Sequence, residues 1–153
     1  MTNSENIFEN VAMISTYTAR EGVEDGVLVA LNGPLYSEFG DAWMPAMVAE
    51  AGIRLPVLMT AGAFDDCVAP IGDDEQLAPG QDIKGRLWDV LNLTAWAMRR
   101  NKSDHRAHFN IKYLPNVPKA SERHGLRVTR RLIIAIGAGD DGPYLTILRP
   151  EDD

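Results

Sequence analysis

Hydrophobic residues recur at helical spacing over one stretch of the chain, residues 85–100 (GRLWDVLNLTAWAMRR). Residues three and four apart lie on one face of a helix, and the residues that share this face are Leu87, Leu91, Thr94, Ala95 and Met98. The pattern predicts a central amphipathic helix over about residues 84–101, with Asp82 as its N-cap. Trp88 and Trp96 lie among Leu and Met, so we expect both in the core.

After this helix the hydrophobic period changes from helical to alternating. Residues 107–113 (AHFNIKY) alternate apolar and polar side chains, as a half-buried strand does. Residues 126–136 and 144–148 predict two further strands, separated by the turn residues 137–143 (GAGDDGP). We therefore expect a C-terminal antiparallel three-stranded meander packed against the central helix.

The N-terminal half predicts short mixed elements. Residues 27–31 (VLVAL) are typical of a buried strand, and residues 44–51 predict a short helix. Residues 53–59 contain Pro56 and predict an edge strand or an extended connector. Thr60 is the expected cap of a helix over residues 61–68. The fold class is α+β, and without a repeat or linker residues 1–153 form a single globular domain.

Composition limits the compartment and the class of protein. The chain has one cysteine, Cys67, which excludes an internal disulfide framework and suits a reducing cytoplasm. The first ten residues do not form a signal peptide, and no apolar run is long enough to span a bilayer. We therefore expect a cytoplasmic protein of a bacterial host with no membrane partner.

Charge is distributed unevenly along the sequence. Residues 1–83 carry a net charge of −12, residues 84–136 of +9 and residues 137–153 of −4. This asymmetry is compatible with separate acidic and basic faces, and equally with internal pairing of the two segments. One basic patch consists of Lys112, Lys119, Arg123, Arg127, Arg130 and Arg131. Pairing with the acidic half is its favoured interpretation, and overall acidity argues against direct nucleic-acid binding.

The candidate catalytic and metal-binding patterns are weak. His105 and His108 would point to opposite faces of a strand, which argues against a metal site with His124. The neighbouring carboxylates of Asp65 and Asp66 should raise the pKa of Cys67 rather than activate its thiol. The acidic run at residues 73–75 lacks EF-hand spacing, and residues 137–142 lack the Lys of a phosphate loop. We expect neither a metal nor a cofactor.

Several stretches resemble, in order, a family of uncharacterised proteins (a domain of unknown function) commonly encoded on bacterial plasmids and phages. They are residues 15–18 with Arg20, 24–29, 56–57, Thr60, 66–68, 85–91 and 139–142. The resemblance covers most of the chain, although residues 32–44 are longer than the family pattern. No activity is assigned to this family, so no functional residue carries over. The resemblance implies a cytoplasmic accessory protein of a mobile genetic element.

Two functional interpretations follow. In the first, a non-catalytic protein binds a host protein through an acidic surface and inhibits a DNA-targeting defence system of the CRISPR or restriction type, whose basic surface binds DNA. The residues of this surface are Glu24, Asp25, Asp65, Asp66, Asp73, Asp74 and Glu75. The alternative is a small nucleotide-processing or hydrolytic enzyme with a site near Tyr17, Arg20 and Glu24. Apolar residues within 35–47 allow a homodimer interface, and burial in the core explains them equally well.

Overall fold

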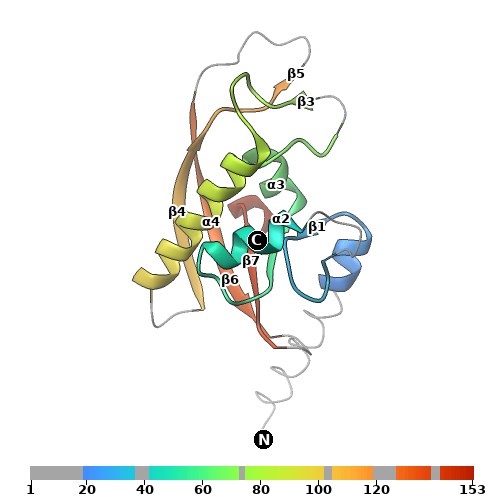
Figure 1. Ribbon diagram of the computed structural model, residues 1–153, viewed down its shortest axis with the longest axis vertical. Coiled ribbons are helices and arrows are strands. Elements are labelled where there is room, and N and C mark those ends of the chain that lie inside the picture. The colour runs from blue at the N-terminus through green and yellow to red at the C-terminus, as the bar shows by residue number, and fades with distance from the viewer. Residues whose placement is uncertain (1–18, 37–41, 73–74, 102–104, 119–126, 139–141) are drawn as a thin grey trace, which may run out of the picture.

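A five-stranded mixed β-sheet organises the chain (Figure 1). The computed structural model describes residues 19–36, 42–72, 75–101, 105–118, 127–138 and 142–153. The strands, in their order across the sheet, are β1 (Leu28–Ala30), β2 (Val57–Thr60), β7 (Tyr144–Leu148), β6 (Val128–Gly137) and β4 (Arg106–Tyr113). Strands β2 and β7 pair in parallel, and all other neighbours in this sheet are antiparallel. The fold is therefore α+β, as the sequence predicts.

The predicted three-stranded meander does not exist as a sheet of its own. β4, β6 and β7 pair antiparallel, but β7 continues into β2 and the sheet extends to β1. The prediction that residues 53–59 form an edge strand or connector holds only for residues 53–56, which are neither helix nor strand; from Val57 on the chain forms β2, which lies between two strands. Pro56 directly precedes β2, and its carbonyl accepts a hydrogen bond from Leu145 N at 2.9 Å. The proline therefore costs no donor inside the strand.

The remaining elements are short except for one helix. They are α2 (Trp43–Glu50), α3 (Ala61–Cys67), α4 (Ile83–Arg100), the 3-10 turn η1 (Pro150–Asp152) and the paired strands β3 (Glu75–Gln76) and β5 (Val117–Pro118). The side chains of Thr60 and Asp82 accept hydrogen bonds from Ala63 N and Gly85 N, so each caps a helix as predicted. Residues 19–24 are also helical.

Helix α4 packs along the sheet and buries Leu87, Leu91, Thr94 and Ala95 in the main core. The expectation for the two tryptophans is only partly met. Trp88 is half-buried, but Trp96 is 49% exposed. Trp96 lies one turn after Asn92 and one turn before Arg100, on the polar side of the helix.

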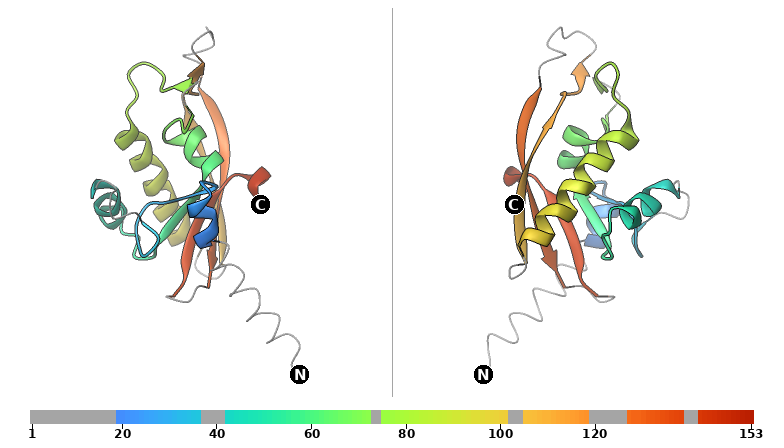
Figure 2. Two further views of the ribbon diagram at one scale, coloured as in Figure 1. Left: turned by 90° about the vertical axis from the view of Figure 1, so that its right-hand side faces the viewer. Right: turned by 60° about the vertical axis from the view of Figure 1, so that its left-hand side comes forward.

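The two faces of the sheet are covered differently (Figure 2). Alternate strand residues such as Met59 and Ile147 belong to the main core beneath α4. Leu58 and Tyr144 point to the opposite face, where they pack against Ala19 of the helical residues 19–24. On that second face β4 and β6 carry exposed polar side chains, namely Arg106, His108, Asn110, Lys112, Thr129 and Arg131. Within the described residues, no helix has the length and apolarity that a membrane crossing requires.

Candidate functional site

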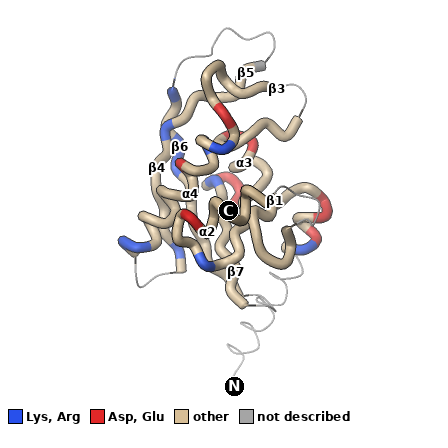
Figure 3. Tube along the Cα trace, viewed as in Figure 1, with Lys and Arg blue, Asp and Glu red and all other residues tan. Residues whose placement is uncertain are grey.

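Opposite charges occupy different parts of the molecule (Figure 3). Lys and Arg positions follow β4 and β6, whereas Asp and Glu positions gather beside β1 and near α3. Glu21, Glu24 and Asp25 are exposed on the helical segment and the turn before β1. Arg131 and Lys112 are exposed on β6 and β4. The charge asymmetry of the sequence thus appears in part, because Lys and Arg line β4 and β6, whereas the carboxylates beside β1 have the exposed Arg20 among them.

Internal pairing accounts for part of the basic segment. Arg106 contacts Asp153 at 2.6 Å, and Arg130 pairs with Glu151. Arg130 Nε also lies 3.1 Å from Asp66 Oδ2, in an electrostatic contact without hydrogen-bond geometry. Among the described residues, most carboxylate partners therefore come from residues 151–153. The expected pairing with the acidic N-terminal half is limited there to Asp66.

Asp66 is the centre of a polar cluster between α3 and the C-terminus. Arg149 Nη1 donates to Asp66 Oδ2 at 3.3 Å, and the same guanidinium makes two hydrogen bonds to the carboxylate of Asp152. Thr60 Oγ1 donates to Asp152 Oδ2 at 2.7 Å. These bonds, led by that from Arg149, lower the pKa of Asp152 to about 2. Gly62 leaves the space that the Arg149 guanidinium occupies.

Arg86 is the second polar centre, and it is buried. Its guanidinium donates to the carbonyls of Cys67 and Asp66 at 3.1 and 2.6 Å, and to Asn116 Oδ1 at 2.9 Å. The two carbonyls lie at the C-terminal end of α3, where the helix dipole favours a cation. Arg86 therefore fixes the first turns of α4 to the end of α3.

The groups beside Arg86 are poor nucleophiles and poor acids. Burial, followed by the charge of Asp66, raises the pKa of Cys67 to about 12. Burial likewise raises the pKa of Tyr113 to about 12. Both side chains are neutral at physiological pH, and the neighbouring polar groups bond to one another. The arrangement is a hydrogen-bonded network that joins α3, α4 and Asn116.

The predicted acidic residues do not all share one environment. Glu24 and Asp25 are exposed, whereas the carboxylate of Asp66 forms salt bridges with Arg130 and Arg149. Asp65 Oδ1 accepts from Ile71 N at 2.8 Å, and Glu75 Oε2 lies 3.4 Å from the side-chain amide of Asn116. Asp73 and Asp74 lie outside the described residues. Glu24 and Asp25 are thus the members whose carboxylates remain open on the described surface.

The structure describes only two of the three residues of the enzymatic alternative. Arg20 and Glu24 are both exposed, one turn apart on the helical residues 19–24, and Tyr17 lies outside the described residues. His105 and His108 are exposed. Within the ranges that the structure describes, no three His, Cys, Asp or Glu side chains converge as metal ligands.

The side chains of Arg86 and Arg149 were not identified by the sequence patterns. Arg86 lies one helical turn before Val90 and two before Thr94, so helical spacing places it on the buried face. Arg149 continues the alternation of Leu145 and Ile147 and therefore points to the core side of the sheet. Both positions could have been recognised from the sequence as facing the core. A cation at a core position implies a buried hydrogen-bond or charge partner.

Comparisons of the chain with family models, with curated proteins and with solved structures gave no match.

Proposed function

We propose that this protein is a non-catalytic binding protein that docks on a basic protein surface through an acidic turn. The turn consists of Glu24, Asp25 and Gly26 and leads into Val27. The observation that carries the proposal is the combination of two exposed carboxylates with Val27, whose side chain is 60% exposed. An exposed apolar residue beside carboxylates offers both contact area and electrostatic selection of a partner.

The backbone holds this turn in a fixed conformation. Asp25 N and Val27 N donate to Glu21 O and Gly22 O, each at 2.8 Å. Gly26 has a φ of 80°, which suits glycine, and Val27 O accepts from Ala61 N at 2.7 Å. A preformed turn loses little conformational entropy on binding, which favours affinity.

A second acidic element repeats the combination of carboxylate and exposed aliphatic side chain. Ile71 is 52% exposed, and its backbone N–H bonds to Asp65 Oδ1. Asp66 supports this element from inside through its arginine partners, so we assign it a structural contribution to the surface. Glu75 follows in β3 and is half-buried. These residues supply a second contact region beside α3.

The proposed partner is a bacterial DNA-binding protein. Surfaces that bind DNA are basic, and an acidic folded protein competes for them through complementary charge. The resemblance to proteins of plasmids and phages suggests the context of host defence, with a CRISPR or restriction component as the target. Inhibition of that component is the biological role that we propose.

The experiment is affinity capture from bacterial lysate with the purified protein. Capture by the wild type is compared with capture by Glu24→Lys/Asp25→Lys and by Val27→Ser. The matched control is Glu50→Lys, an exposed charge reversal at the end of α2. Each capture is repeated at low and raised salt, because exposed charge pairs are screened by salt.

The expected result is a DNA-binding protein that the wild type and Glu50→Lys capture and that both turn variants lose. Raised salt should weaken the capture. Equal capture by the doubly charge-reversed variant would refute the assignment of the turn as the docking surface. In a DNA-cleavage assay, the captured protein should lose activity when the wild type is added.

A further inference from the structure

Strand β4 is an open edge of the five-stranded sheet. It has eight residues and pairs with β6 on one side only. Within the described part of the chain, no strand pairs with its other side. A long open edge presents unpaired N–H and C=O groups that another extended chain can join.

The ladder shows which backbone groups face this edge. Ile136 N donates to His105 O, so His105 belongs to a bonded pair with β6. Bonded pairs alternate along an antiparallel ladder. The N–H and C=O groups of Arg106, His108, Asn110 and Lys112 therefore point to the open side. Consistent with this, the side chain of Asn101 donates to Arg106 O at 2.9 Å.

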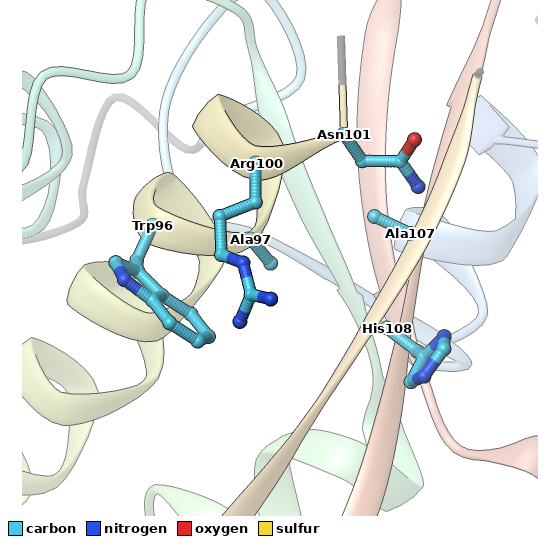
Figure 4. Close-up of a pocket in the computed structure, with 6 residues that line it drawn as sticks. All are labelled: Trp96, Ala97, Arg100, Asn101, Ala107 and His108. Atoms are coloured by element: carbon cyan, nitrogen blue, oxygen red, sulfur yellow. The ribbon is translucent and has the colours of Figure 1, made fainter. Parts of the chain in front are cut away.

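A groove runs between this edge and the last turns of α4 (Figure 4). Its volume is about 270 Å³, below the range of about 300–1,000 Å³ that is usual for small-molecule sites. Its lining residues are Trp96, Ala97, Arg100, Asn101, Ala107 and His108. The guanidinium of Arg100 lies over the Trp96 ring at 4.5 Å from its centroid, so a cation and a half-exposed aromatic ring together form the α4 side of the groove.

The charge of this region selects the kind of occupant. Arg106, Lys112 and Arg131 are exposed on β4 and β6, Arg100 lines the groove, and Asp153 pairs with Arg106. A second copy of the chain would place the cations of one β4 against those of the other, which is unfavourable. A nucleic acid would satisfy the cations but has no strand backbone for the edge. An extended acidic peptide matches the charge, the edge and the groove.

We propose that β4 binds an extended acidic peptide segment of a protein partner, which adds to the sheet as a sixth strand. Acidic side chains of the peptide pair with Lys112 and Arg131, and an aliphatic side chain enters the groove beside Trp96. This surface differs from the acidic turn in place and sign of charge, so it goes beyond the function proposed above.

The test uses fluorescence anisotropy with the full chain and a capped eight-residue peptide of alternating Glu and Val. Three matched probes accompany it. They are the Lys–Val peptide, the Glu–Val peptide with alternate amides N-methylated, and a single-stranded oligonucleotide. N-methylation removes backbone donors and leaves the charge unchanged, so it separates strand pairing from simple charge attraction.

Two pairs of variants locate the site. Asn110→Pro removes an outward N–H at the edge, and Asn110→Ala keeps it. Trp96→Ala removes the aromatic wall, while Ile83→Ala shortens an exposed apolar side chain at the other end of α4. Thermal unfolding checks that each variant is folded.

The expected result is binding of the Glu–Val peptide that weakens at least about tenfold on N-methylation, in Asn110→Pro and in Trp96→Ala. Asn110→Ala and Ile83→Ala should bind as the wild type does. No binding up to about 1 mM peptide, or equal binding of the N-methylated peptide, would overturn the proposal. Competition by the oligonucleotide alone would identify a polyanion surface instead. A dimer that Asn110→Pro dissociates would identify a second copy as the occupant.

Discussion

Replacement of Arg86 by methionine tests the structural network most sharply. Arg86 is only 4% exposed, and its guanidinium bonds to two carbonyls at the end of α3 and to Asn116. Methionine keeps much of the side-chain volume but donates no hydrogen bond. The variant therefore isolates the donors from the packing.

The magnitude follows from the acceptors that lose their partner. Asn116 is half-buried, so its amide oxygen can bond to water in place of Arg86, and the two carbonyls decide the result. Each buried acceptor without a donor costs about 1–3 kcal/mol. Loss of the buried cation offsets part of this cost, because its desolvation penalty is removed. We expect Arg86→Met to lower the free energy of unfolding by about 3 kcal/mol. Arg86→Lys keeps the charge but not the fork of donors, so it should cost about 1–2 kcal/mol.

The assay is urea unfolding monitored by circular dichroism. The slope m, which is the change in the free energy of unfolding with urea concentration, is compared between variants. The control is Arg99→Met, the same chemical change on the exposed last turn of α4, which should cost under about 1 kcal/mol through the helix dipole. Equal stabilities of Arg86→Met and Arg99→Met, at unchanged m, would refute the view that Arg86 joins α3 to α4.

Three further predictions concern the cluster of Arg149 and Asp152 and the buried Cys67. Gly62→Ala should destabilise the wild type by about 1–3 kcal/mol, because its new methyl group meets the Arg149 guanidinium. In an Arg149→Ala background the same change should be neutral or stabilising, since alanine favours helix, and additive costs in a double-mutant cycle would contradict this. The pKa of Asp152 is about 2 against an ordinary 3.8, so its ion pair stabilises the fold above about pH 4, and this contribution is lost as the pH falls towards 2. The contribution of this ion pair to the free energy of unfolding is at most about 2 kcal/mol. Asp152→Asn should remove this pH dependence from urea unfolding curves. An unchanged pH dependence in the variant would argue against the pair. Cys67 is 1% exposed with a pKa raised to about 12, so a thiol reagent at pH 8 should label it only after unfolding, and labelling of the native protein at the rate of a free thiol would show that it is accessible.

The periodic patterns of hydrophobic residues predicted the individual helices and strands. They did not predict which strands pair with each other in the sheet. Thr60 and Asp82 are caps because a cap needs only a side chain and a backbone N–H three residues on. The position of β2 could not be predicted, because its neighbours β1 and β7 are set by the topology of the whole sheet. The exposure of Trp96 follows from its helical position between Asn92 and Arg100, which its apolar neighbours in the sequence do not reveal.

The candidate surfaces were predictable only in part. Net charge along the sequence was compatible with separate faces and with internal pairing, and it did not indicate that Asp66 is the carboxylate that Arg130 and Arg149 contact. The groove beside Trp96 depends on α4 ending next to the edge of β4, which no local pattern reveals.

The most direct test of the proposed function compares the proteins captured from bacterial lysate by the wild type, Glu24→Lys/Asp25→Lys and Glu50→Lys, with quantitative mass spectrometry. The account predicts a DNA-binding protein that is enriched by the wild type and by Glu50→Lys, and lost with the charge-reversed turn. A partner retained by all three, or no enriched protein at low salt, would contradict docking through the acidic turn.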